Sequence, residues 1–120
     1  MARMLFHCTH GQEDPERAIL PFLAANMAVQ SGQDAVVLLT VEGACLGRRG
    51  GADGIAHAGL PRLPDVIAEF VDNGGTIWVG GACATPRGIT EDQLVKGARI
   101  VGAATVLEEV ATGRVPVAMA

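Results

Sequence analysis

The chain has 120 residues and a formal net charge of −4, a size that suits one domain with its own hydrophobic core. It contains no run of lysines or arginines, so we expect no nucleic-acid partner. The longest nearly continuous apolar run covers residues 35–41 and is too short to span a bilayer, so we expect no membrane association. We therefore predict one domain over residues 1–120.

The first half of the chain predicts two strands with a helix between them. Residues 3–8 form a short apolar run. Asp14 followed by Pro15 is a typical helix start, because Asp caps free N–H groups and Pro suits the first turn. Pro21 removes one hydrogen bond within this helix and predicts a bend. Residues 35–41 are apolar without alternation, which is typical of a strand buried on both faces.

The second half continues the alternation of strands and helices. Cys83 falls in a predicted loop, and Thr90 and Gln93 have the spacing of a capping box, which predicts a short helix ending near Gly97. The other predicted elements are a helical turn over 44–46, helices over 64–73 and 103–112, and strands over 76–79, 99–101 and 115–119. This order predicts an α/β fold, with a mostly parallel sheet of four to five strands and helices on both faces.

The cysteines gather at one predicted edge of the sheet. In open parallel sheets, ligands bind beyond the carboxyl ends of the strands. Cys8 ends the first predicted strand, Cys45 follows the second and Cys83 follows the third. We therefore expect all three thiols at the edge where a ligand would bind. Other residues predicted to line this site are His10, Glu42, Gly80 and Gly81.

Cys83 is the strongest candidate for chemistry. It follows two glycines and precedes Arg87 by four residues. The thiolate is the nucleophilic form of cysteine, and a nearby cation stabilises it. We therefore predict Cys83 and Arg87 as catalytic residues. The alternative for each cysteine is a buried thiol that packs as a small hydrophobic residue, and a loop histidine such as His10 is commonly only solvated.

Other chemistries have less support in the sequence. Three cysteines and nearby histidines could supply zinc ligands, but close pairs such as C-x-x-C are missing. We therefore expect neither a metal nor another cofactor. The glycine-rich stretch 47–54 lacks the lysine of a phosphate-binding loop and is typical of a flexible turn. An odd number of cysteines without close pairs favours free thiols in a reducing, cytoplasmic setting.

Three segments, taken in order, resemble the DsrE/DsrF-like family of small sulfur-relay proteins. They are residues 10–18 (His-Gly-Gln-Glu-Asp-Pro-Glu-Arg-Ala) with Pro21 and Phe22, residues 38–43 (Leu-Leu-Thr-Val-Glu-Gly), and residues 80–83 (Gly-Gly-Ala-Cys) continuing through 87–89 and 102–108. The resemblance implies a three-layer α/β/α sandwich with a five-stranded parallel sheet. It also implies a homo-oligomer, often a trimer or hexamer.

The resemblance also implies a role for Cys83. In sulfur-transferring members of the family, the cysteine after this strand carries sulfur as a persulfide. One branch has a second cysteine three residues earlier, where this chain has Gly80, so a disulfide between those two positions is impossible here.

Two functions follow as hypotheses. The first is a cytoplasmic sulfur carrier or sulfurtransferase that takes persulfide sulfur onto Cys83 from a donor protein and passes it to a partner thiol. The second is a non-catalytic oligomeric module that holds a small ligand at the same sheet edge, with residues 47–59 as a lid.

Overall fold

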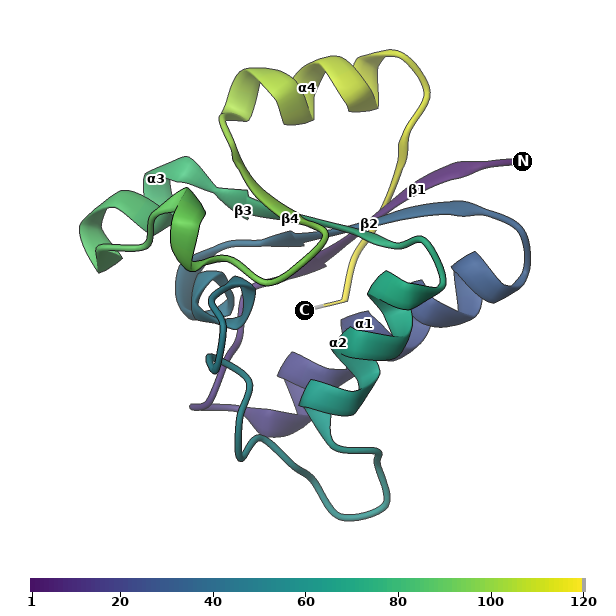
Figure 1. Cartoon of the computed structure of the whole chain (residues 1–120). Coiled ribbons are helices and arrows are strands. Elements are labelled where there is room, and N and C mark those ends of the chain that lie inside the picture. The colour runs from purple at the N-terminus through teal and green to yellow at the C-terminus, as the bar shows by residue number, and fades with distance from the viewer. Residues whose placement is uncertain (120) are drawn as a thin grey trace.

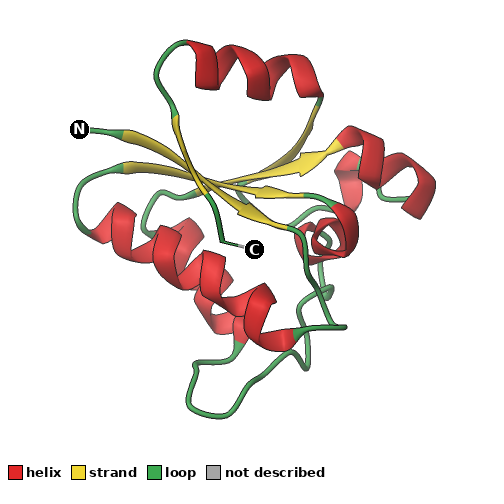
Figure 2. Ribbon diagram, turned by 180° about the vertical axis from the view of Figure 1, so that it is seen from behind, coloured by secondary structure: helices red, strands yellow, loops and turns green. Residues whose placement is uncertain are grey.

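Five parallel strands form the sheet in the computed structural model, which describes residues 1–119. The strands are β1 (Arg3–Cys8), β2 (Asp34–Leu39), β3 (Thr76–Gly80), β4 (Ala98–Val101) and β5 (Val115–Val117). They lie in the order β4-β3-β2-β1-β5, and every neighbouring pair is parallel. Figures 1 and 2 show this twisted sheet from opposite sides.

Helices cover both faces of the sheet (Figure 1). α1 (Pro15–Gln30) and α2 (Leu63–Asp72) lie on one face, and α4 (Ala103–Ala111) lies on the other. Parallel crossovers are right-handed. The chain moves from β1 to β4 in one direction across the sheet and returns from β4 to β5 in the other, so α4 is placed on the opposite face. The predicted three-layer α/β/α sandwich is therefore confirmed, with five strands.

The larger core lies between the sheet and the pair α1 and α2. α1 begins as predicted, with the Asp14 carboxylate accepting a hydrogen bond from the Arg17 N–H at 3.2 Å. The helix continues through Pro21, which is buried. Phe22 of α1 meets Phe70 of α2 edge to face, with 6.0 Å between ring centroids. This packing fixes α1 and α2 against the sheet.

The core beneath α4 is smaller. It consists of Leu5, Val36, Leu38, Trp78 and Val101, with Val106 of α4 packed against it. α4 contributes no fully buried residue. This helix therefore covers its face of the sheet only partly.

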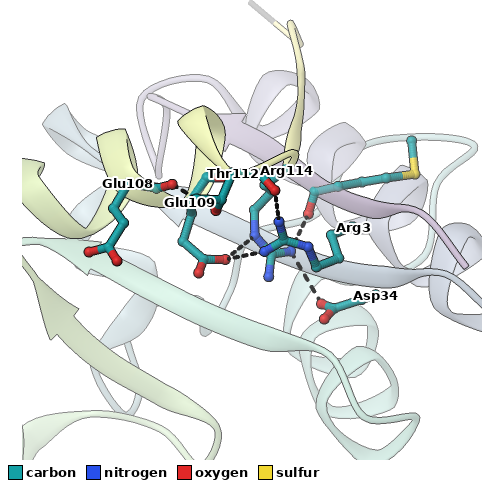
Figure 3. Close-up of polar contacts among 7 residues, drawn as sticks. Arg3, Asp34, Glu108, Glu109, Thr112 and Arg114 are labelled. Atoms are coloured by element: carbon teal, nitrogen blue, oxygen red, sulfur yellow. Dashed lines mark hydrogen bonds and ion pairs between the residues drawn. The ribbon is translucent and has the colours of Figure 1, made fainter.

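Polar contacts at the carboxyl end of α4 hold the helix to the sheet (Figure 3). Arg114 is only 6% exposed. Its guanidinium donates to the carboxylates of Glu109 at 2.7 Å and Asp34 at 3.2 Å. Arg3 also reaches Glu109, at 3.2 Å. Arg114 lies over the Trp78 ring, 5.5 Å from its centroid. These contacts join α4 to the first residues of β1 and β2.

Two sequence predictions about strand ends are wrong. The strand predicted over 35–41 ends at Leu39. Leu39 pairs with Cys8 and Val79, and it is the last residue of β2 in register with either neighbour. The Thr40 N–H still donates to the Cys8 carbonyl oxygen at 3.1 Å. The chain turns at Val41 into the 3₁₀ helix η1 (Val41–Gly47). The last strand is also shorter than predicted and ends at Val117.

The segments after β3 also differ from prediction. The predicted loop at Cys83 is helical and consists of α3 (Gly81–Ala84) and the 3₁₀ helix η2 (Thr85–Arg87). The predicted capping box is present, with Thr90 and Gln93 each accepting a backbone hydrogen bond, but it caps only the 3₁₀ helix η3 (Glu91–Gln93). None of the helices within residues 1–119 is long and apolar enough to cross a membrane.

Candidate functional site

The carboxyl ends of β1, β2 and β3 bring the three cysteines to one edge of the sheet. Cys8 is the last residue of β1, Cys45 lies in η1 after β2, and Cys83 lies in α3 after β3. These strands are neighbours in the sheet. Their surroundings differ, however, and the differences separate their chemistry.

Cys83 is the cysteine with the most directed polar environment. Its side chain is half-buried and free of any disulfide. The backbone N–H of Val41 donates a hydrogen bond to its sulfur, with 3.1 Å between N and Sγ. A backbone N–H aimed at sulfur stabilises negative charge there. The predicted candidate therefore has a specific partner for its thiolate form.

The hydrogen bond to Cys83 comes from strained backbone. Val41 has φ of +54° and is the one residue besides glycine with positive φ among residues 1–119. A β-branched residue in this region is a genuine outlier, because its Cβ crowds the following carbonyl. Strain of this kind persists only where the surrounding structure enforces it, and it is common at functional sites. Here it directs the Val41 N–H toward the thiol.

Arg87 joins the helical segment after Cys83 to η1. Its guanidinium donates to the carbonyl oxygen of Cys83 at 3.2 Å and to the Glu42 carboxylate at 2.8 Å. The hydrogen bond that Arg87 donates to Glu42 raises the pKa of Arg87, and the charges of Glu42, Cys45 and Cys83 add smaller contributions in the same direction. Arg87 therefore carries its positive charge within electrostatic reach of both thiols.

Cys45 faces a polar pocket of about 540 Å³. Glu13, Glu42, Arg48 and Asp53 also line this pocket. The loop after η1 supplies part of the wall. Glu42 lines this pocket and also binds Arg87, so the Glu42–Arg87 pair links the surroundings of the two thiols.

Cys8 is a core residue. Its side chain is 1% exposed, and burial raises the pKa of the thiol to about 11. The sulfur lies 3.4 Å from the carbonyl oxygen of His10, to which it donates. The structure therefore supports the buried, inert alternative for this cysteine.

His10 lies at the same sheet edge, but its ring is occupied. Its Nδ1 lies 2.7 Å from the Glu13 carboxylate, and no contact joins the ring to Cys83 among the described residues. Glycine at position 43 allows η1 to pack closely against the end of β1, because a Cβ there would lie 2.5 Å from the Cys8 carbonyl oxygen. His10 is thus part of the wall between β1 and η1.

The backbone at the two predicted glycines, Gly80 and Gly81, lies close to neighbouring atoms. A Cβ at Gly80 would lie 3.2 Å from the methyl carbon of Thr40, and one at Gly81 would lie 3.4 Å from the Val101 carbonyl oxygen. Both residues line a pocket beside Cys83, together with Val101 and residues of α4. Glycine here allows the chain to turn from β3 into α3 close to its neighbours.

Sequence reasoning missed two parts of this site. Val41 contributes through its backbone, and nothing in its side chain marks it. The wall formed by the end of β4 and the start of α4 was also missed, although the rule that ligands bind beyond strand ends applies equally to Val101. Within residues 1–119, no three His, Cys, Asp or Glu side chains are grouped so that they could hold a metal ion.

Comparison with known proteins identifies relatives of the chain. The model of the DsrE/DsrF-like family matches residues 2–115. The uncharacterized protein MJ0760 of Methanocaldococcus jannaschii is 32% identical over 99 residues, which cover 82% of this chain. The match covers 36% of that relative, so the chain spans about a third of its length.

Two solved structures share the fold. The crystal structure of the ychN protein from E. coli superimposes with a TM-score of 0.78 at 15% sequence identity, covering 98% of this chain and 99% of that one. The protein of unknown function MTH1491 from Methanobacterium thermoautotrophicum gives a TM-score of 0.75 at 16% identity, again covering 98% and 99%. Because the family model matches nearly the whole chain, the protein belongs to the DsrE/DsrF-like family.

Proposed function

We propose that the protein is a sulfur carrier that holds persulfide sulfur on Cys83 and transfers it to a partner thiol. The observation that carries this proposal is the hydrogen bond from the strained Val41 N–H to the Cys83 sulfur. A structural thiol needs no such donor, because neutral cysteine packs as a small hydrophobic residue. Membership of the DsrE/DsrF-like family supports the proposal.

The transfer proceeds as thiol–disulfide exchange. The Cys83 thiolate attacks the outer sulfur of a donor persulfide, so a bond forms between Sγ and that sulfur. The sulfur–sulfur bond of the donor breaks, and its electron pair leaves with the donor thiolate. In the second step, the thiolate of the acceptor attacks the outer sulfur on Cys83 and releases the Cys83 thiolate. No external oxidant or reductant is required.

The surrounding residues have distinct parts in this proposal. The Val41 N–H stabilises the anion on Sγ before attack and after release. Arg87 supplies positive charge nearby, and Glu42 fixes its position. The proposed partners are sulfur donor and acceptor proteins, and the proposed assembly is a homo-oligomer. Three free cysteines suit the reducing cytoplasm, where we place the reaction.

Intact mass spectrometry after incubation with a persulfide donor tests the proposal. We expect the wild type to gain the mass of a sulfur atom, a C83A variant to gain nothing and a C45A variant to load like the wild type. Sulfur must then leave when an acceptor thiol is added. Absence of loading on the wild type, or equal loading on C83A, would refute the proposal.

The second candidate is a non-catalytic module that holds a small ligand. The polar pocket beside Cys45, partly walled by the loop after η1, favours it. Alkylation separates the two candidates. A carrier requires rapid labelling of Cys83 in the folded protein near neutral pH, whereas a purely structural thiol labels at an appreciable rate only on unfolding.

A further inference from the structure

Beside Cys83 lies a second pocket, which differs in character from the one at Cys45. It has a volume of about 280 Å³ and lies between the end of the sheet and the start of α4. Its wall includes Leu38 of β2, Val101 of β4, and Val106 and Leu107 of α4, with Cys83 at one side. Figure 1 shows that α4 starts near the same end of the strands as α3.

No charged side chain lines this pocket. Thr40 is the lining residue with a polar side chain, and its hydroxyl is already paired with His7 Nε2 at 2.7 Å. Its methyl carbon is the atom nearest to a Cβ built on Gly80. The surface offered to a ligand is therefore apolar, in contrast to the carboxylate-lined pocket at Cys45.

The pocket is large enough for an organic group. An apolar cavity of roughly 150 Å³ stays dry and binds benzene, so about 280 Å³ admits a substituted ring or a branched alkyl chain. Partial coverage by α4 leaves it open, since Leu107 is 69% exposed. A Cβ at Gly102 would meet no atom within 4 Å.

We propose that this pocket binds the apolar body of a small organic persulfide that carries no charged group besides the persulfide itself, whose outer sulfur is attacked by Cys83. The inference rests on the proposed sulfur transfer and adds a small-molecule class of donor to the donor proteins named above. The apolar lining, the absence of charged side chains and the presence of Cys83 in the wall together select a molecule whose body is an uncharged hydrocarbon group. The step is the one described above: Sγ bonds to the outer sulfur, and the organic thiolate departs.

The test compares two neighbouring substitutions on α4. Ala103 and Ala104 are both exposed in the first turn of the helix, but only Ala103 lines the pocket. Ala103→Leu places a larger side chain at the pocket, and Ala104→Leu is the matched control. The probe is dipyridyl disulfide, a neutral aromatic molecule that reacts with a thiolate and releases a coloured thione. Peptide mass mapping confirms the label on Cys83.

We expect Ala103→Leu to slow the reaction with dipyridyl disulfide about tenfold relative to Ala104→Leu, the scale on which small changes in an apolar pocket act. Iodoacetamide does not need the pocket and should label Cys83 at the same rate in both. Gly102→Leu gives an independent check, because φ at this residue is −90° and leucine adopts it without strain. Equal rates with the disulfide in all three variants would overturn the inference.

Two further outcomes separate this inference from its foundation. If the wild type takes sulfur from inorganic polysulfide but the variants show no difference toward the disulfide, the pocket inference fails and the carrier stands. If the variants differ but no sulfur is ever loaded, the carrier fails and persulfide as the ligand fails with it, and the result shows only that the pocket binds apolar groups. If Ala103→Leu changes the mass of the assembly in light scattering while Ala104→Leu does not, another copy of the chain occupies the pocket and the inference fails.

Discussion

The backbone strain at Val41 leads to a prediction about both stability and reactivity. Val41 and Val115 are each 49% exposed, but only Val41 has positive φ. Replacing either valine by glycine removes the same side chain from a similarly exposed position. It also adds the same flexibility to the unfolded chain, which costs about 0.5–1 kcal/mol. The loss of the side chain and the added flexibility of the unfolded chain therefore cancel when the two variants are compared with each other.

What remains of the difference is the strain at Val41 and the strand preference of valine at position 115 in β5, and both make Val41→Gly the more stable variant. A residue with Cβ pays roughly 1–2 kcal/mol in the left-handed region, and glycine does not. Val41→Gly should therefore be more stable than Val115→Gly by about 1–2 kcal/mol. Urea denaturation followed by circular dichroism measures both free energies of unfolding, and equal slopes against urea show that the comparison is valid. Equal stability of the two variants would refute the assignment of strain.

The same pair of variants tests the link to Cys83. Glycine at position 41 keeps the N–H but no longer holds it in place, so part of the hydrogen bond to Sγ is lost. Such a bond contributes about 0.5–1 kcal/mol, which corresponds to a two- to fivefold slower alkylation of Cys83. Val115→Gly should label like the wild type. If Val41→Gly labels as fast as the wild type, the N–H does not assist the thiolate.

Three further predictions concern other parts of the molecule. Arg114→Met should lower the free energy of unfolding by about 2 kcal/mol, because it leaves carboxylates without their buried partner. Arg99 is an exposed cation 5.6 Å from the Trp78 ring centroid, so Arg99→Met should lower the free energy of unfolding by less than about 1 kcal/mol. If urea denaturation shows a larger loss for Arg99→Met than for Arg114→Met, the structural role given to Arg114 is wrong. The thiol of Cys8 has a pKa raised by burial from 9.0 to about 11. The unfolded chain therefore loses this proton first, and the free energy of unfolding should fall as pH rises from 9 to 11, by up to ~1.4 kcal/mol per unit. The chain has no tyrosine to add its own titration, and Cys8→Ala should remove the slope; persistence of the slope in that variant would assign it to another group. Glu42→Gln frees the Arg87 cation and should speed alkylation of Cys83 about twofold at low salt, with the gain fading at high salt. Unchanged rates would mean that this cation does not act on the thiol.

Much of the fold was predictable from local sequence patterns. The unbroken apolar run of β2 indicated a strand covered on both faces, and Asp14 before Pro15 located the start of α1. These signals are short-range, because they depend on side chains within a few residues of each other. Once strands and helices alternate, right-handed crossovers leave few arrangements of the chain. The placement of Cys83 beyond β3 followed from that topology.

Other features depended on contacts between distant parts of the chain. The end of β2 was misplaced, because Thr40 and Val41 are as suited to a strand as the residues before them, and only the ends of the neighbouring strands stop the pairing. The helical form of the segment around Cys83 was also missed. Four small or weakly helical residues give little local signal, and their conformation is settled by packing against η1 and β4.

The sequence by itself determined the α/β architecture and brought the cysteines to one edge of the sheet, since both follow from hydrophobic periodicity and chain direction. Only the tertiary structure decided which thiol is suited to chemistry. Cys8 is buried and shielded from solvent, Cys45 faces carboxylates, and Cys83 receives a backbone N–H from a residue 42 positions away. Burial and hydrogen bonding depend on which segments meet in space, and no local pattern of residues records that.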